Sequence, residues 1–375
     1  MRATLIFLHK YIGLILGLLL SITGISGSMI VFDRELDELI TPQTADFEAA
    51  DTLASFDLAL DNARVAVNNG TEPTRLMLGR HNGAPHIIRF PTPEGAAGPI
   101  EVSINPGTAE VLAVRNWGEY PVTWMYHLHL SFFGGERGEI LVGILGFCLL
   151  FFCLSGIYIW WPKAGQVWRA FTIRRDAGAF RFNFDLHKTA GIYFLPVFLM
   201  LAVTGIEIVW HEPFEHVVAT VLPVQEAPTP SSSPGSSPSG DPLGMDAAAA
   251  SAQAVFPESQ MARLYVPAQA EDPWRVTFMH PEETWSEYGA STVYLDQYSG
   301  DVLDVWDSRE LSAGSTFLEW MFPLHNGDAL GLIGRIIVFI AGWLPALLFG
   351  TGVYMWWKKR RKVSNQNRLL TMLAD

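Results

Sequence analysis

Two short motifs of this 375-residue chain occur twice, and every copy carries a histidine. His9 and His187 lie in LHKYIG and LHKTAG, whereas His129 and His325 end WMYHLH and WMFPLH. Neutral imidazole is the commonest metal ligand among side chains. Zinc usually takes three or four protein ligands, whereas a haem iron can be held by two imidazoles on opposite sides of a flat apolar macrocycle. The paired histidines therefore predict two haem sites, His9 with His187 and His129 with His325.

Three further residues lie close to these motifs in the sequence. His127 neighbours His129, but Pro323 stands at the corresponding position of the second motif. His211 follows an apolar run, and Glu207 lies four residues earlier on the same helical face. His127 and His211 are thus alternative ligands, and Glu207 is predicted to accept a hydrogen bond from a ligating imidazole.

The chain contains no Cys-x-x-Cys-His motif, so covalent attachment of c type is excluded and any haem is predicted to be haem b. The two cysteines, Cys148 and Cys153, lie together in one apolar run and are interpreted as small buried residues. No catalytic side chain is assigned from the sequence.

Long apolar runs must position these histidines. The chain is 49% hydrophobic and only 17% charged, and its apolar residues are concentrated in four runs, of which only the third carries a charge, Glu207. About 20 apolar residues span the hydrocarbon core of a bilayer as a helix. The sequence therefore predicts a mainly α membrane protein with transmembrane helices over 11–32, 140–161, 187–210 and 336–357.

Positive charges predict the orientation of these helices. The segments 1–10, 162–186 and 358–375 together hold 13 of the 25 Lys and Arg residues. Because short cytoplasmic segments are enriched in Lys and Arg, both termini and the loop 162–186 are predicted to be cytoplasmic. The segments 33–139 and 211–335 then lie outside and carry most of the net charge of −13, which makes nucleic acid an improbable partner.

The order of motifs predicts two tandem parallel repeats, each a helix, an outer α+β domain and a second helix. Each outer domain contains a predicted β-hairpin, over 102–117 and 293–308. The final helices end alike, in SGIYIWWPK at 155–163 and TGVYMWWKK at 351–359. The second outer domain also has a Pro/Ser/Gly tract at 227–242, predicted to be a flexible linker, and an Ala-rich stretch at 247–257, predicted to be a short helix.

These motifs, in this order, resemble the PepSY-associated transmembrane family, also labelled iron-regulated membrane proteins. Within that family the chain looks most like the inner-membrane ferric-siderophore reductases of the ferrioxamine type, over essentially its whole length. The resemblance implies a multi-pass protein of the bacterial inner membrane with a PepSY-like periplasmic domain in each repeat and two haems. It implies axial ligands at His9, His187, His129 and His325, with His127 and His211 as further candidates.

The predicted function is that of a di-haem b oxidoreductase that passes electrons to a ferric siderophore in the periplasm, because Fe(II) suits the hard oxygen donors of a siderophore less well than Fe(III). No dinucleotide-binding or flavin-binding motif is present, so a quinol or a separate reductase is expected to supply the electrons. Two alternatives remain: a transporter of the iron–siderophore or its ligand, and a PepSY-type membrane sensor or anchor without haem. Parallel repeats suit a transporter, but four charge-poor helices offer little to line a substrate pathway.

Overall fold

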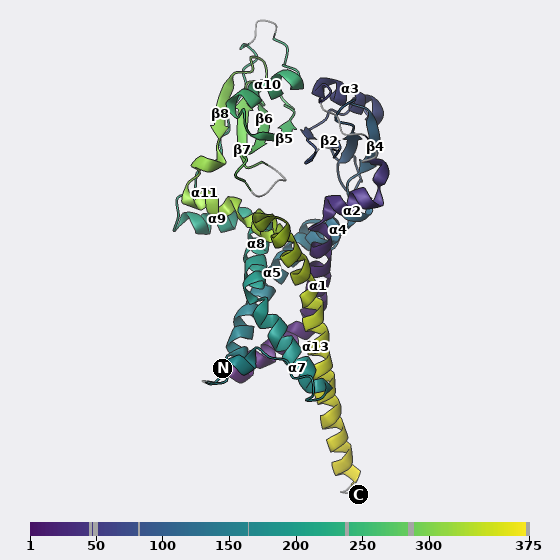
Figure 1. Cartoon of the computed structure of the whole chain (residues 1–375), viewed down its shortest axis with the longest axis vertical. Helices are drawn as coiled ribbons and strands as arrows, with labels where there is room; N and C mark the ends of the chain where they lie inside the picture. The colour runs from purple at the N-terminus through teal and green to yellow at the C-terminus, as the bar shows by residue number, and fades with distance from the viewer. Residues whose placement is uncertain are drawn as a thin grey trace.

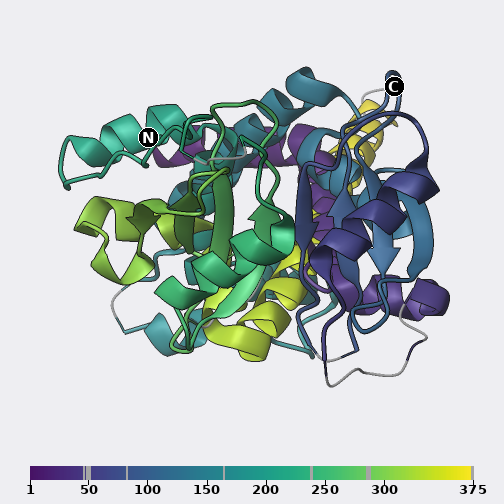
Figure 2. The same cartoon turned by 90° about the horizontal axis from the view of Figure 1, so that it is seen from above.

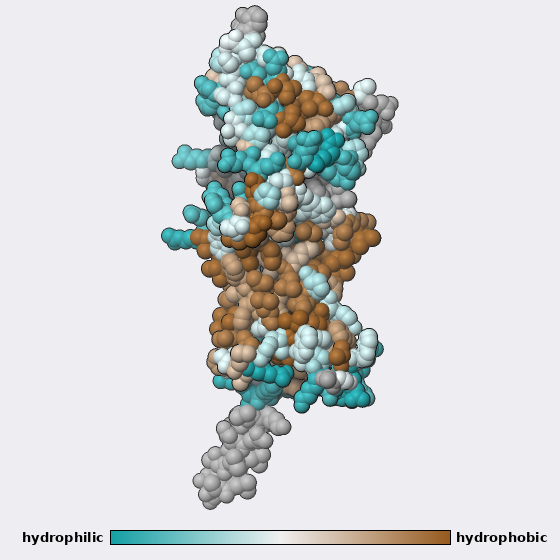
Figure 3. Space-filling view, turned by 90° about the vertical axis from the view of Figure 1, so that its left-hand side faces the viewer, coloured by the Kyte–Doolittle hydropathy of each residue, from teal (hydrophilic) through white to brown (hydrophobic). Residues whose placement is uncertain are grey.

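The computed structural model has a helical bundle at one end and a β-sheet domain at the other, and both chain ends lie at the end of the bundle away from the sheet (Figure 1). The structure describes residues 1–44, 47, 52–81, 83–163, 165–236, 240–283 and 289–372. On the face shown in Figure 3, a hydrophobic band covers the bundle, and hydrophilic surface lies above and below it. Such a band is the surface expected where a protein meets lipid.

Three helices of the described chain are long and apolar enough to cross a membrane: α1 (Arg2–Ile30), α5 (Gly135–Trp160) and α13 (Gly331–Met372). A fourth crossing requires α7 (Ala179–Tyr193) and α8 (Leu195–Val209) together, and these two helices are bent by 60°. The prediction of one continuous helix over 187–210 is therefore wrong. Pro196, in the first turn of α8, lacks the N–H and the space that a continuing helix needs, so α7 ends before it.

The membrane helices pack as two pairs, α1 with α13 and α5 with α8. At the first crossing, a Cβ on Gly24 would lie only 2.4 Å from the carbonyl oxygen of Gly342. At the second, a Cβ on Gly143 would lie 2.5 Å from the Trp210 ring. Small residues thus let the backbones approach closely, which is the usual basis of helix packing in lipid. Each pair joins the N-terminal half of the chain to the C-terminal half.

The outer segments form one antiparallel sheet rather than two separate domains. Its eight strands have the order β4-β3-β2-β1-β5-β6-β7-β8. The strands are β1 (Arg75–Met77), β2 (His86–Arg89), β3 (Ile100–Ile104), β4 (Val111–Asn116), β5 (Gln260–Tyr265), β6 (Trp274–Met279), β7 (Ser291–Leu295) and β8 (Val302–Trp306). The predicted hairpins are confirmed as β3–β4 and β7–β8.

The two halves of the sheet meet where β1 pairs with β5, and we call this pairing the seam. Leu76 lies opposite Leu264 at the seam, and each half continues outward in the same strand order. The strand topology is therefore symmetric about this residue pair. Separate domains over 33–139 and 211–335 would each expose an unpaired strand edge, and the seam satisfies both edges at once.

Two helices cover one face of the sheet, α3 (Phe56–Val67) and α10 (Met245–Val255). They lie in front of the strands when the molecule is seen from above (Figure 2). One continuous hydrophobic core, with Leu60, Leu76 and Leu264 among its buried members, runs beneath both helices. The Ala-rich helix predicted at 247–257 is confirmed as α10, whose buried alanines allow it to lie close to the strands.

The two covering helices also cap each other. The Asp57 carboxylate accepts hydrogen bonds from the N–H groups of Met245 (2.6 Å) and Asp246 (3.2 Å), at the start of α10. The Asp246 carboxylate in turn accepts from Phe56 N–H (2.7 Å), at the start of α3. Each aspartate thus satisfies free N–H groups of the other helix, where negative charge is also favoured by the helix dipole.

Short helices join the sheet to the bundle. They are α2 (Asp33–Ile40), η1 (Pro42–Thr44), α4 (Pro121–Ser131), α9 (His211–Ala219), η2 (Ser308–Glu310), α11 (Ala313–Glu319), α12 (Met321–Asn326) and η3 (Asp328–Leu330). Helix α6 (Val167–Ala170) lies instead in the loop between α5 and α7. Helix α4 packs on α1 and α5, whereas α12 packs on α8 and α13. The two WM…LH motifs therefore lie on short helices packed against the bundle.

The tract predicted as a flexible linker at 227–242 is held to the sheet domain over part of its length. Ser232 is buried, its N–H donates to Glu271 O (2.8 Å), and Ser233 N–H donates to the Asp296 carboxylate (2.8 Å). Residues 237–239 lie outside the described residues. Asp296 therefore fixes a segment whose composition alone indicated a free linker.

Candidate metal-binding histidine pairs

The first histidine pair lies at the end of the bundle away from the sheet. His9 of α1 and His187 of α7 have ring centres 6.4 Å apart, with their planes at 70°. His9 Nδ1 is 2.8 Å from the Ser155 hydroxyl of α5. His187 Nδ1 is 2.9 Å from the Thr351 hydroxyl and 3.0 Å from Leu348 O, both of α13. Each imidazole is thus held by the last helix of its own half.

The second pair lies nearer the sheet. His129 of α4 and His325 of α12 have ring centres 6.2 Å apart, with their planes at 56°. His129 Nδ1 is 2.9 Å from Thr23 O of α1, and His325 Nδ1 is 2.8 Å from the Thr204 hydroxyl of α8. A Cβ on Gly27 would come within 2.7 Å of the His129 ring, so this glycine makes room for the imidazole.

The Nδ1 partners identify the nitrogen that is left for a ligand. A carbonyl oxygen only accepts, so Nδ1 of His129 and of His187 carries the proton. The Thr204 hydroxyl donates to Met200 O (2.8 Å) and accepts from His325. Among the described residues, Nε2 of the four paired histidines makes no hydrogen bond. This is the arrangement of a metal-binding histidine, in which the other ring nitrogen donates to the protein.

The ring spacing also fits a shared metal. Two imidazoles that each bind one metal at about 2.0 Å through a single nitrogen have ring centres roughly 6 Å apart. No group of three or more His, Cys, Asp or Glu side chains suited to a bare metal ion occurs in the described part of the chain. Two imidazoles without further protein donors fit a metal whose remaining ligands come from a macrocycle.

The two pairs lie at different depths along α1. Fourteen residues separate His9 from Thr23, whose carbonyl holds His129, and this corresponds to about 20 Å along the helix axis. Both pairs take one histidine from each half of the chain. The sites therefore follow the bundle axis from one end to the other.

His127 does not belong to the pair formed by His129 and His325. Its ring lies against Trp117, with ring centres 4.7 Å apart, and its Nε2 is buried without a hydrogen-bond partner among the described residues. A Cβ on Gly118 would lie 2.4 Å from that nitrogen. His127 thus packs into the turn after β4, and Pro323, at the corresponding position of the second motif, is buried in α12.

His211 also lies apart from the pair, but it has the predicted carboxylate partner. It begins α9, beyond a break at Trp210, and its side chain is 58% exposed. His211 Nδ1 is 2.5 Å from a carboxylate oxygen of Glu207, which is itself buried. The predicted contact between Glu207 and His211 is therefore present, although it belongs to neither histidine pair.

The residues that orient the rings were not among those predicted from the sequence. Ser155 and Thr351 lie in the repeated SGIYIWW and TGVYMWW, and Thr23 and Thr204 each precede a Gly-Ile pair. All four are followed by glycine, and Gly156 and Gly352 lie beside the rings of His9 and His187. The repeated hydroxyl–glycine pairs were the available signal, because one lies in each of α1, α5, α8 and α13.

A membrane-spanning bundle with a sheet domain on one end and imidazole pairs at two depths is the class of protein that these observations define. The sequence model of the PepSY-associated TM region matches residues 7–359, and the chain therefore belongs to that family. A relative from Pseudomonas aeruginosa, named only as an uncharacterized protein, is 38% identical over 82 residues. That match covers 22% of this chain and 20% of the relative, so it spans about a fifth of each.

Proposed function

We propose that this protein is a di-haem b oxidoreductase of the bacterial inner membrane that passes electrons across the bundle to a ferric siderophore. Two imidazole pairs carry the proposal. Their ring centres lie 6.4 and 6.2 Å apart, and each Nδ1 lies within hydrogen-bond distance of a protein oxygen. Four membrane crossings in two parallel repeats would supply these histidines symmetrically. A bound haem supplies one-electron chemistry, and the chain positions it and sets its electrostatic surroundings.

The four paired histidines would hold the two groups. His9 and His187 would bind the one on the cytoplasmic side, where the Lys- and Arg-rich segments lie. His129 and His325 would bind the one beneath the sheet domain, on the periplasmic side. Electrons would enter from a quinol or a separate reductase, and the outer pair would lie nearest the ferric substrate.

Reduction of the substrate explains why no acid–base group is needed at this site. A siderophore holds Fe(III) through hard oxygen donors, and Fe(II) suits the same donors less well. One electron transferred to the chelate therefore loosens the metal without proton chemistry by the protein. The charge-poor bundle serves this role better than it serves transport of a polar complex.

The first test is the absorption spectrum of the purified protein. We expect a Soret band and a haem b content of two per chain. His9→Ala or His187→Ala should each remove about half of the haem. The absence of a Soret band after expression with ample haem would contradict the proposal and favour a transporter or a sensor.

The second test separates the two sites. His129→Ala or His325→Ala should abolish reduction of a ferric siderophore, followed by trapping of Fe(II), while the spectrum of the inner haem stays intact. His127→Ala serves as the matched control, because His127 lies against Trp117 and not in the pair. Wild-type reduction rates in both pair variants would place the outer ligands elsewhere.

A further inference from the structure

One transverse row of side chains crosses the whole sheet on the face opposite α3 and α10. The strand registers place eight residues side by side, from β4 to β8: Arg115, Glu101, Arg89, Arg75, Tyr265, Arg275, Tyr294 and Asp304. Their neighbours in each strand, such as Leu76 and Leu264, point into the core. Solubility alone does not require charged and phenolic side chains to line up across all eight strands of a sheet.

The row faces the bundle. Arg115 donates two hydrogen bonds of 2.8 Å to the Asp37 carboxylate of α2. Glu101 accepts a 2.7 Å hydrogen bond from the hydroxyl of Tyr120, the residue before α4. Because α2 and α4 lie between the sheet and the bundle (Figure 1), the row lies on the side of the outer histidine pair.

The cations at one end of the row are balanced by carboxylates. Arg115 pairs with Asp37, and Arg89 pairs with Glu101 at 2.5 Å. At the seam, two arginines of the row lack a carboxylate partner in the described part of the chain. Neither Arg75 nor Arg275 forms an ion pair with any described residue, and Arg75 Nε has no hydrogen-bond partner among them.

The seam gathers three arginines around one phenol. Arg75 and Arg263 flank the Leu76–Leu264 pair from opposite strands, and Arg275 follows on β6. The guanidinium carbons of Arg275 and Arg75 lie 4.5 and 5.7 Å from the centre of the Tyr265 ring.

The pKa values of these groups reflect burial and the charges of their neighbours. Burial and then the neighbouring Arg89 and Arg263 lower the pKa of Arg75, while Tyr265 opposes them. Burial alone would raise the pKa of Tyr265, but Arg263, Arg75 and Arg275 together bring it below its ordinary value. Arg75 and Arg275, which form no ion pair with a described residue, place positive charge at the seam of a chain whose net charge is −13, and this charge is suited to attract an anion.

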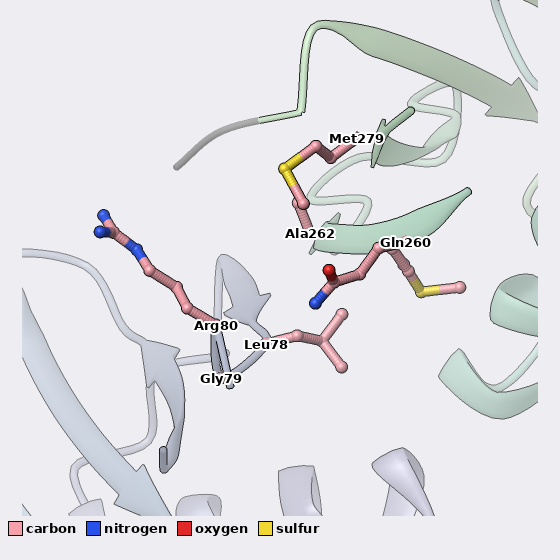
Figure 4. A pocket seen from close by; sticks show the side chains of 7 residues that line it. Leu78, Gly79, Arg80, Gln260, Ala262 and Met279 are labelled. Carbon is pink, nitrogen blue, oxygen red and sulfur yellow. The ribbon is translucent and has the colours of Figure 1, made fainter. Parts of the chain in front are cut away.

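The seam also provides a recess. Where β1 ends and β5 begins, Arg80, Gln260 and Met279 stand around a small hollow (Figure 4). Met279 lies on the same face of β6 as Arg275, because four residues separate them along the strand. Met279, at the edge of the hollow, and the seam arginines therefore lie on the same face of the sheet.

We propose that Arg75, Arg263 and Arg275 bind the oxygen anions of a ferric chelate of net negative charge. The planar guanidinium matches carboxylate and catecholate-type oxygen pairs better than an ammonium would. The substrate identity rests on the proposed function, whereas the anion site rests on the arginines alone. The site selects anionic chelates over cationic ones.

Binding is tested with the full-length protein in nanodiscs of zwitterionic lipid. The probe is the gallium(III)–EDTA anion, a redox-inert substitute for ferric EDTA, titrated by calorimetry. Arg75→Gln with Arg263→Gln should weaken binding at least about tenfold, because hydrogen bonds to charged groups are lost. Arg275→Gln, at an exposed position, should also weaken binding while leaving thermal unfolding unchanged.

The matched control is Arg64→Gln on α3, whose side chain pairs with Asp61 and Glu72 on the other side of the sheet. It should bind gallium–EDTA as the wild type does. Added salt should weaken wild-type binding by screening. Equal affinity in the wild type and the double variant would overturn the site, as would an equal loss for a cationic gallium–hydroxamate chelate.

Three further measurements separate the possible explanations. If phosphatidylglycerol in the nanodisc abolishes chelate binding, the arginines hold a lipid headgroup and the proposal fails. If ferric EDTA is reduced at the wild-type rate by the double variant, the anion site fails while the reductase function stands. If the protein binds gallium–EDTA through these arginines but contains no haem, the site stands and the proposed function fails.

Discussion

At the scale of single residues, four imidazoles from four different helices have the same orientation. Each Nδ1 faces an oxygen of a Ser or Thr hydroxyl or of a main-chain carbonyl, and each ring lies beside a glycine. Such partners fix the tautomer and the plane of the ring, and they increase the basicity of the other nitrogen. In the proposed di-haem protein, the residues that hold these rings should therefore control the haem potentials as well as haem retention.

Removing one hydroxyl tests this control. Thr204→Val takes away the acceptor of His325 Nδ1–H, which makes the imidazole a weaker donor to Fe(III). We expect the midpoint potential of the outer haem to rise by roughly 60 mV, the equivalent of a tenfold change for one electron. Thr189→Val is the control, because that buried hydroxyl has no hydrogen-bond partner among the described residues. Identical potentials in both variants would show that Thr204 only packs.

Glu319 predicts a pH-dependent stability. Burial, followed by the charges of Glu283 and Glu207, raises the pKa of Glu319 to about 7, although His211 opposes the shift. Since this value lies above the ordinary 4.5, the fold gains stability below about pH 4.5 and loses it as the pH rises through 7. Glu319→Gln should therefore stabilise the protein at pH 8 by about 1–3 kcal/mol and have little effect at pH 4.

Thermal unfolding in detergent at both pH values measures this effect. Glu310→Gln, at an exposed position of η2, is the control and should change neither melting temperature. A gain for Glu319→Gln that is equal at pH 4 and pH 8 would contradict titration of Glu319 as the cause.

At the scale of elements, the sequence predicts local structure better than the contacts between distant segments. Alternation and turn residues identified both hairpins, and the alanine content identified α10. The break at Phe194 was available from Pro196 but was hidden by the hydrophobicity of the surrounding run. The β1–β5 seam could not be predicted, because β1 has only three residues and its partner lies almost two hundred positions away.

For the histidines, too, the sequence predicted some features of the site and not others. Repetition of His9 and His187, and of His129 and His325, pointed to paired sites, and the structure brings each pair together. His127 and His211 remained open because a residue's type does not say where its ring will point. Packing against Trp117 and the contact with Glu207 decide those directions.

The reciprocal caps of α3 and α10 predict coupled stability between the halves. Asp57→Ala or Asp246→Ala removes the cap of the other helix and should cost about 1–2 kcal/mol. Because the two carboxylates share the same set of contacts, the double variant should lose less than the sum of the single losses. Unfolding of the four proteins of this double-mutant cycle gives the coupling. Asp61→Ala, in an exposed ion pair of α3, is the control and should stay within about 1 kcal/mol of the wild type.

At the scale of the whole molecule, both ends of the chain lie on one side of the bundle and the sheet lies on the other (Figure 1). Because 13 of the 25 Lys and Arg residues lie in 1–10, 162–186 and 358–375, the end with the termini should be cytoplasmic. A green fluorescent protein fused to the C-terminus should therefore fluoresce in bacterial cells. Alkaline phosphatase fused after Leu222 should be active, and inactivity of this fusion with activity of a C-terminal one would reverse the orientation.

Because the seam and both histidine pairs combine residues from the two halves of the chain, neither half alone contains a complete sheet or a complete histidine pair. A chain cut in the loop 162–186 would yield two fragments, each with one imidazole of every pair and half of the sheet. Alone, a fragment would hold two unmatched ligands and an open strand edge. Brought together, the fragments would regenerate both sites at once, so cofactor uptake in cells that produce both pieces would report their reassembly directly.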